Sequence, residues 1–150
     1  MNPETFSFDL EDLARKLTPN TKGVIWVHMI GIISQEYQQI VNFCRDHELF
    51  LIEDCAHAHG AEIDGKMAGT LGDAGCFSFF PTKVLTTGTG GMITTNNAEL
   101  MVYAKEVRLL GRHIETGEVV HKSNDWFMDE IRACIGYHGL SGVKSNLERR

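Results

Sequence analysis

Residues 77–83 read FSFFPTK, and residues 86–91 read TTGTGG. The first stretch predicts a buried apolar strand that ends close to Lys83, and the second surrounds this lysine with hydroxyl groups and glycines. A lysine that is partly removed from water loses its proton more readily, and the neutral amine can then attack a carbonyl carbon. The pattern therefore predicts a lysine that holds an aldehyde cofactor as a Schiff base. Nearby hydroxyls and backbone N–H groups would suit the cofactor's phosphate.

A second apolar run, residues 49–52 (LFLI), ends at Glu53 and Asp54. A short continuous run of this kind is typical of a parallel strand that is buried on both faces. Ligands of open α/β sheets lie beyond the carboxyl ends of the strands, so we expect Asp54 at the same site as Lys83. A buried carboxylate needs a positively charged or hydrogen-donating partner. A protonated pyridine nitrogen is such a partner, and its protonation makes the ring an electron sink.

The surrounding patterns predict an α/β fold with a mostly parallel sheet. Asp9 is placed to cap a first helix, and residues 24–28 form a strand. A helix capped by Ser34 then leads to the strand at residues 49–53, which is the spacing of a right-handed βαβ unit. Residues 60–75 are rich in glycine and polar residues and predict a loop.

Two more strands and two more helices are expected after this loop. The strands are residues 76–80 and 91–95. Asn96 and Glu99 have the spacing of a capping box that opens a helix ended by Gly111. An amphipathic last helix is expected to present an inner face made of Met128, Ile131, Ile135 and His138.

Composition narrows the class of protein. The 150 residues suffice for one modest domain, and no apolar run approaches the roughly 20 residues that span a bilayer. Residues 1–4 lack the features of a signal peptide, and the net charge of −6 disfavours a nucleic-acid partner. The four cysteines form no Cys-x-x-Cys pair and lie beside apolar residues, which predicts buried free thiols in a reducing cytoplasm.

Five stretches, in their order and spacing, resemble one known family: residues 27–31 (VHMIG), 53–61 (EDCAHAHGA), 72–79 (GDAGCFSF), Lys83 and residues 87–92 (TGTGGM). This is the DegT/DnrJ/StrS family of pyridoxal-phosphate-dependent sugar aminotransferases of fold type I. The resemblance runs from about Thr5 to Arg150. It implies a three-layer α/β/α fold in which residues 1–150 are the central part of the large cofactor domain. The N-terminal part and the C-terminal small domain of the family would lie outside this chain.

The resemblance also implies a role for each matching residue. Lys83 looks like the lysine that bonds the cofactor and later moves protons, and Asp54 looks like the partner of the pyridine nitrogen. His57 takes the position of a residue that lies against the cofactor ring, and Ser78 that of a phosphate ligand. Asn124 resembles an asparagine that reaches the phosphate from the neighbouring subunit, which implies a homodimer.

Three residues depart from the family's pattern. Asp125 competes with Asn124 for the position of the phosphate-binding asparagine, and an aspartate would repel a phosphate. Thr89 stands where glutamate is common, and Phe127 stands where a basic residue is common. These departures bear on the substrate and the subunit contact, and they leave Lys83 and Asp54 untouched.

The activity implied by the resemblance is transfer of an amino group from an amino acid, usually glutamate, to a keto sugar attached to a nucleotide. Such products enter polysaccharide, lipopolysaccharide or antibiotic sugar synthesis. No membrane partner, nucleic acid or metal is expected.

Three alternatives stay open at this stage. Relatives that dehydrate deoxysugars carry histidine in place of the lysine, so Lys83 argues against that reaction. A catalytically incomplete binding or interaction unit is compatible with a chain much shorter than the family's. A zinc-dependent hydrolase would use Asp54, His57 and His59 as ligands, but it leaves Lys83 unexplained.

Overall fold

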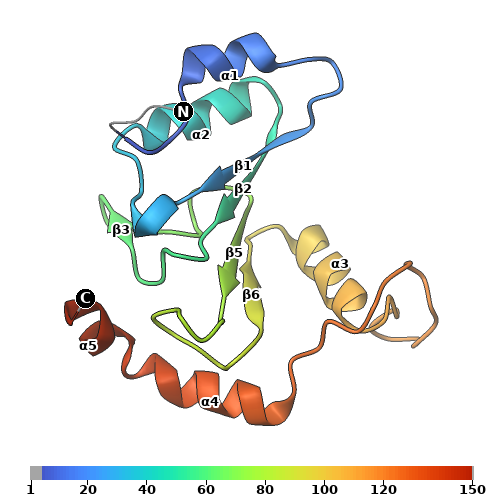
Figure 1. Ribbon diagram of the computed structural model, residues 1–150. Helices are drawn as coiled ribbons and strands as arrows, with labels where there is room; N and C mark the ends of the chain where they lie inside the picture. Colours follow the sequence, from blue (N-terminus) through green and yellow to red (C-terminus); the bar gives the residue numbers. More distant parts are fainter. Residues whose placement is uncertain (1–4, 150) are drawn as a thin grey trace.

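The computed structural model describes residues 5–149. Its centre is a four-stranded sheet in the order β1-β2-β5-β6 (Figure 1). Strands β1, β2 and β5 run parallel, and β6 pairs antiparallel with β5. The predicted α/β fold with a mostly parallel sheet is therefore confirmed. The strand bounds are Gly23–Val27 (β1), Phe50–Asp54 (β2), Ala74–Ser78 (β5) and Gly91–Thr94 (β6).

The predicted βαβ unit is formed by β1, helix α2 (Tyr37–Asp46) and β2. Tyr37, Ile40 and Cys44 recur on one side of α2 and are buried. A short 3-10 helix, η1 (Met29–Gly31), follows β1 at the carboxyl edge of the sheet. The N-cap of α2 is Glu36, so the expected Ser34 cap is wrong by two residues. The Ser34 hydroxyl instead accepts a hydrogen bond from the Glu36 backbone N–H at 3.2 Å.

Helices α1 (Leu10–Lys16) and α2 lie on the same side of β1 (Figure 1). The predicted cap of α1 is confirmed, because the Asp9 carboxylate accepts a hydrogen bond from the Asp12 backbone N–H. Apolar residues of α1 pack against a core that includes Trp26 and Leu51. The opposite face of the sheet is open over β1, where the Ile25 side chain is 64% exposed.

Residues 60–75 are not a plain loop. They contain a two-stranded antiparallel hairpin made of β3 (Glu62–Ile63) and β4 (Lys66–Met67). Asp64 and Gly65 turn the hairpin with φ angles of 49° and 74°, in the left-handed region that aspartate and glycine tolerate.

Helix α3 (Ala98–Arg108) begins one residue later than expected. Asn97 adopts the extended cap conformation, and its side chain accepts a hydrogen bond from the Leu100 N–H at 3.0 Å. The expected capping box with Asn96 is therefore wrong. The side chain of Thr95 fixes this register, because its hydroxyl accepts a hydrogen bond from the Asn97 N–H.

Helices α4 (Glu130–Leu140) and α5 (Val143–Glu148) complete the described chain. Glycines let α4 lie close to residues 85–87: a Cβ on Gly136 would come within 2.9 Å of the Thr87 methyl group. The apolar residues expected on the inner face of α4 are largely exposed, with Ile131 at 75% and Ile135 at 51%. No helix in the described part of the chain is both long enough and apolar enough to cross a membrane.

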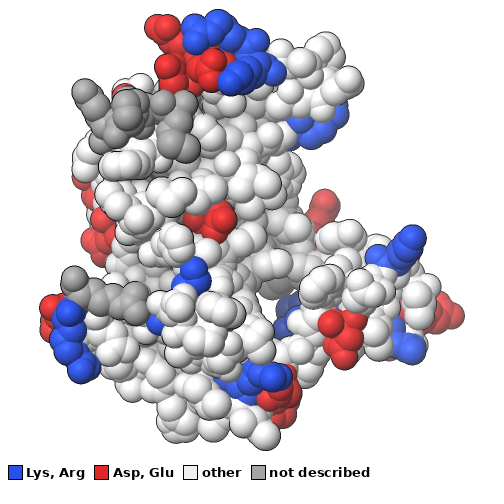
Figure 2. All heavy atoms as spheres, viewed as in Figure 1, with Lys and Arg blue, Asp and Glu red and all other residues white. Residues whose placement is uncertain are grey.

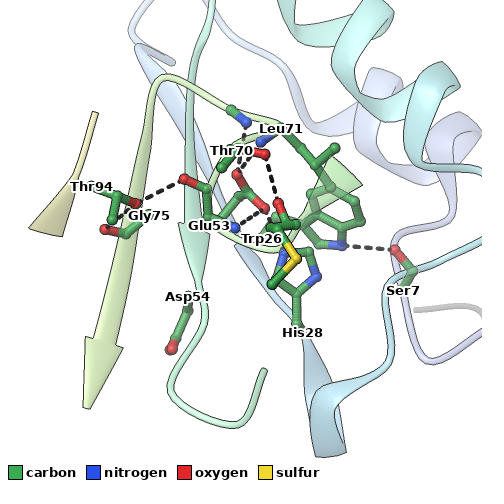
Figure 3. Close-up of polar contacts among 12 residues, drawn as sticks. Ser7, Trp26, His28, Glu53, Asp54, Thr70, Leu71, Gly75 and Thr94 are labelled. Atoms are coloured by element: carbon green, nitrogen blue, oxygen red, sulfur yellow. Dashed lines mark hydrogen bonds and ion pairs between the residues drawn. The ribbon is translucent and has the colours of Figure 1, made fainter. Parts of the chain in front are cut away.

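The Glu53 carboxylate, at the centre of the sheet, is fully buried and accepts four hydrogen bonds (Figure 3). Three come from the backbone N–H groups of Gly69, Leu71 and Gly72 at 2.7–2.9 Å. The fourth comes from Nε2 of His28 at 2.8 Å. Burial by itself raises the pKa of Glu53, but the hydrogen bonds from His28 and the three amides outweigh it, so the pKa is lowered. One ionised side chain thus joins the end of β1, strand β2 and the segment that leads to β5.

Replacing Glu53 with leucine should be strongly destabilising, because it leaves three backbone N–H groups and His28 buried without their acceptor. We expect the free energy of unfolding in urea to fall by about 3–5 kcal/mol. The matched control is Glu62→Leu, since Glu62 is exposed on β3. A loss at Glu53 no larger than the loss at Glu62 would contradict the anchoring role.

The Glu53 carboxylate should also make the free energy of unfolding depend on pH in the acidic range. Because the pKa of Glu53 is lowered by folding, its stabilising contribution is complete above the unfolded value of about 4.3 and is lost as the pH falls through the folded value. Glu53→Gln cannot ionise and should therefore show a shallower loss of unfolding free energy below about pH 4.3. Equal slopes for the variant and the wild type, measured by urea unfolding across this range, would exclude the contribution.

Candidate active site

A cavity of about 300 Å³ lies at the carboxyl edge of β2 and β5. Three segments line it: Ile30 of η1; Ala56, His57 and His59 after β2; and Thr82, Lys83 and Val84 after β5. Because β2 and β5 are parallel neighbours, the segments that follow them emerge at the same edge of the sheet. The segments that follow β2 and β5 therefore line one cavity, whereas Asp54, which we expected at the same site as Lys83, is not among the lining residues.

Lys83 is held in a loop whose base is closed by hydrogen bonds. The Phe79 N–H donates to the Gly90 carbonyl at 2.9 Å, and the Thr87 N–H donates to the Phe79 carbonyl at 3.1 Å. The Thr86 hydroxyl also donates to the Phe79 carbonyl, at 2.9 Å. Lys83 itself is half-buried, and no carboxylate of residues 5–149 lies within ion-pair distance of its amine.

Asp54 is the last residue of β2 and is half-buried. One carboxylate oxygen accepts a hydrogen bond from the Ala56 N–H at 3.0 Å. The side chain points away from the Glu53 network, as Figure 3 shows. It does not line the cavity that contains Lys83.

Ser78 ends β5 on the same face of the sheet as Asp54, because Asp54 pairs with Cys76 and side chains alternate along a strand. The Ser78 hydroxyl accepts a hydrogen bond from the Phe80 N–H at 3.3 Å. Ser78 also lies outside the lining of the cavity. The structure thus places Lys83 and His57 around one cavity, and Asp54 and Ser78 at the ends of the two strands beside it.

Asn124 is exposed in the irregular segment that follows α3, and it does not line the cavity either. This segment folds back on α3: Nε2 of His121 lies 2.8 Å from the Glu106 carboxylate, and the Ser123 hydroxyl donates to the Val107 carbonyl. The neighbouring Asp125 carboxylate accepts a hydrogen bond from the Phe127 N–H at 3.0 Å, so it is engaged with its own backbone.

His59 also lines the cavity, a position that the sequence did not reveal. The residue is only 6% exposed. Burial lowers the pKa of His59, and the positive charges of Lys83 and His57 lower it further, against an opposing effect of the Ser78 backbone. Its imidazole is therefore neutral at pH 7. From the sequence, His59 was a candidate only as a zinc ligand, together with Asp54 and His57. Asp54 does not line the cavity.

A different group of possible metal ligands lies deeper. His28, Glu53 and Cys55 are fully buried, and one ligand atom from each lies within 4.8 Å of the others. The Glu53 oxygens already accept four hydrogen bonds, so the carboxylate is occupied as a structural acceptor. Burial raises the pKa of the Cys55 thiol to about 12, which keeps it protonated.

Figure 2 shows few charged side chains over the middle of the molecule and a cluster of both signs at the top. The cluster lies over α1, where Arg15 and Lys16 pair with Glu11 and Asp12. On this helix, charges of opposite sign therefore lie side by side.

Several solved structures that are similar to this fold are aminotransferases. One is the aminotransferase TlmJ from Streptoalloteichus hindustanus, with a TM-score of 0.89 and 32% identity, over 97% of this chain and 40% of that one. The whole chain, residues 1–150, matches the DegT/DnrJ/EryC1/StrS aminotransferase family, and it belongs to that family.

Two further relatives have named activities. GDP-perosamine synthase from Caulobacter vibrioides is 39% identical, over 99% of this chain and 40% of the relative. L-glutamine:2-deoxy-scyllo-inosose aminotransferase from Streptoalloteichus tenebrarius is 40% identical, over 90% of this chain and 34% of the relative. The chain thus spans about two fifths or less of the length of these relatives.

The buried Thr87 hydroxyl should help to hold the Lys83 loop, because it donates to the Thr89 carbonyl at 2.6 Å. Thr87→Val keeps the shape but loses this bond, and we expect protection of the loop amides in hydrogen exchange to fall by about 1 kcal/mol. Thr89→Val is the matched control, since the Thr89 side chain is exposed. Equal protection in the two variants would show that the hydroxyl does not hold the loop.

Proposed function

We propose that residues 1–150 form the central part of the large cofactor domain of a pyridoxal-phosphate-dependent aminotransferase. The enzyme moves an amino group from an amino acid to a keto sugar attached to a nucleotide. The observation that carries this proposal is Lys83: a half-buried amine without a carboxylate partner among the described residues, in a cavity at the carboxyl edge of the sheet. Family membership over the full chain supports it.

The residues around Lys83 fit this cofactor. The cavity offers an amine and, at His57, an exposed flat ring, while a carboxylate and a hydroxyl end the neighbouring strands. When bound, pyridoxal phosphate supplies an aldehyde that bonds to amines and a ring that withdraws electrons.

Each residue has one task in the proposed site. The Lys83 amine binds the aldehyde and, once released, carries a proton at Nζ. The Asp54 carboxylate, which accepts only one hydrogen bond from the described chain, holds the proton of the pyridine nitrogen. His57 lies against the ring, and the Ser78 hydroxyl donates to the phosphate. The Asn124 side chain donates to the phosphate of the neighbouring subunit.

The position of Asn124 outside the cavity is consistent with a role in another subunit's site, and we propose a homodimer for the full-length enzyme. The exposed apolar residues of α4 suit such a contact, since Ile131 and Tyr137 are about three quarters exposed. The names of the two relatives support a sugar-type acceptor.

The name of one relative specifies glutamine as the amino donor of that enzyme. For this chain we propose glutamate as the donor. We expect the product to enter polysaccharide, lipopolysaccharide or antibiotic sugar synthesis, with no nucleic-acid or membrane partner. The four cysteines are free, which suits the cytoplasm, but the expected burial is wrong for Cys134, which is exposed, and Cys76 is only half-buried.

The second candidate function is a catalytically incomplete binding unit, or a pyridoxal-phosphate enzyme of another reaction type. The chain spans about two fifths of the length of the GDP-perosamine synthase that it matches. Both candidate functions share the Lys83 site.

Pyridoxal phosphate should bond to Lys83. We expect a visible absorbance band when it is mixed with the purified chain, and a borohydride-reduced label that peptide mass spectrometry locates on Lys83. Lys83→Met should lose the band, whereas the control Lys105→Met, at an exposed lysine of α3, should keep it. A label scattered over surface lysines would favour the binding-unit reading.

Asp54 should contribute to affinity through the pyridine nitrogen. Asp54→Asn removes a charge-assisted hydrogen bond, and we expect the dissociation constant for pyridoxal phosphate to rise roughly tenfold in a fluorescence titration. Asp64→Asn is the control, because Asp64 is exposed in the hairpin turn. Unchanged affinity in Asp54→Asn would remove Asp54 from the proposed site.

A further inference from the structure

His59 is a buried polar side chain, and the described chain leaves at least one of its ring nitrogens unsatisfied, since the Ser78 backbone can serve only one of them. The residue is 6% exposed. A buried polar atom without a partner costs free energy, so such a group points to a partner supplied by motion or by a ligand. It lines a cavity together with Lys83.

The backbone around His59 is fixed. The Ala58 N–H donates to the Cys55 carbonyl at 2.9 Å, and the Ala61 N–H donates to the Ala58 carbonyl at 3.1 Å. Gly60 has a φ of +75°, a left-handed conformation that lets the chain turn directly after His59. The backbone that carries the imidazole is therefore held by its own loop, and the side chain is buried.

The imidazole of His59 packs against two aromatic rings of residues 77–79. Its centroid lies 5.5 Å from the Phe77 ring, in an edge-on arrangement, and 6.0 Å from the Phe79 ring. These ring contacts satisfy neither nitrogen, and the Ser78 backbone can serve only one of them. Lys83 lines the same cavity, and its positive charge lowers the pKa of His59, after the larger effect of burial.

We propose that His59 is a positioning residue for Lys83: a neutral ring nitrogen on the inner wall of the cavity accepts a hydrogen bond from the Lys83 amine and directs that amine toward an incoming carbonyl. The role deepens the proposed function and rests on it. A neutral imidazole suits the task because it orients an amine without adding the countercharge that would hold the amine protonated. The two side chains then satisfy each other, and His59 never touches the substrate.

The first test measures the rate at which Lys83 forms an imine. Salicylaldehyde serves as the probe because it lacks phosphate and pyridine nitrogen, and pyridoxal phosphate is measured in parallel. His59→Leu should slow both reactions at Lys83 roughly tenfold, as expected for one lost orienting hydrogen bond, and His59→Gln should restore most of the rate. The control His138→Leu changes an exposed histidine on α4 and should match the wild type.

The second test does not depend on the stability of the His59 variants. The His59 ring resonances should titrate in NMR below the ordinary value of about 6.5, and Lys83→Met should move this pKa part of the way upward. An unchanged His59 titration in Lys83→Met, or equal imine rates in His59→Leu and the wild type, would reduce His59 to a core residue.

The two probes separate the possible failures. If salicylaldehyde labels Lys83 and His59→Leu slows it, while pyridoxal phosphate does not react, the positioning role stands and the proposed cofactor is wrong. If pyridoxal phosphate labels Lys83 equally fast in His59→Leu and the wild type, the cofactor stands and the positioning role is wrong.

Discussion

The buried carboxylate of Glu53 organises the carboxyl edge of the sheet. A charge without exposure to water is tolerated only when its oxygens are saturated with donors, and here three backbone N–H groups and His28 supply them. The bonds bring the end of β1 and the segment before β5 to the end of β2. The segments that carry His57 and Lys83 leave the sheet after β2 and β5, the two strands beside this network.

Adjacent side chains at the end of β2 take opposite tasks because they point to opposite faces. Glu53 points into the core, and its carboxylate is fully used by structural hydrogen bonds. Asp54 points away from this network, and one of its carboxylate oxygens has no hydrogen bond from the described chain. A structural role and a free functional group are also neighbours after β5. There a backbone hydrogen bond between Thr87 and Phe79 closes the base of the loop that carries Lys83. Rigid backbone anchoring next to an unpaired functional group is the arrangement that a preorganised site requires.

Much of this arrangement was predictable from local patterns. Continuous apolar runs located β2 and β5, and the Asp9 cap located α1. The hairpin at residues 62–67 was missed because each of its strands has only two residues, too few for a periodic signal. The cap of α3 was misplaced by one residue because Asn96 and Asn97 are equivalent as sequence, and only the Thr95 hydroxyl distinguishes them. The burial of His59 depends on Phe77 and Phe79 of another segment, which no local pattern reveals.

The central claim is that the Lys83 cavity receives an aldehyde cofactor whose pyridine nitrogen meets Asp54. A crystal structure of the chain grown with pyridoxal phosphate tests both halves at once. The account predicts electron density that is continuous from Nζ of Lys83 to the cofactor, with the Asp54 carboxylate within hydrogen-bond distance of the ring nitrogen. Cofactor density bound to another lysine, or a ring turned away from Asp54, would contradict it.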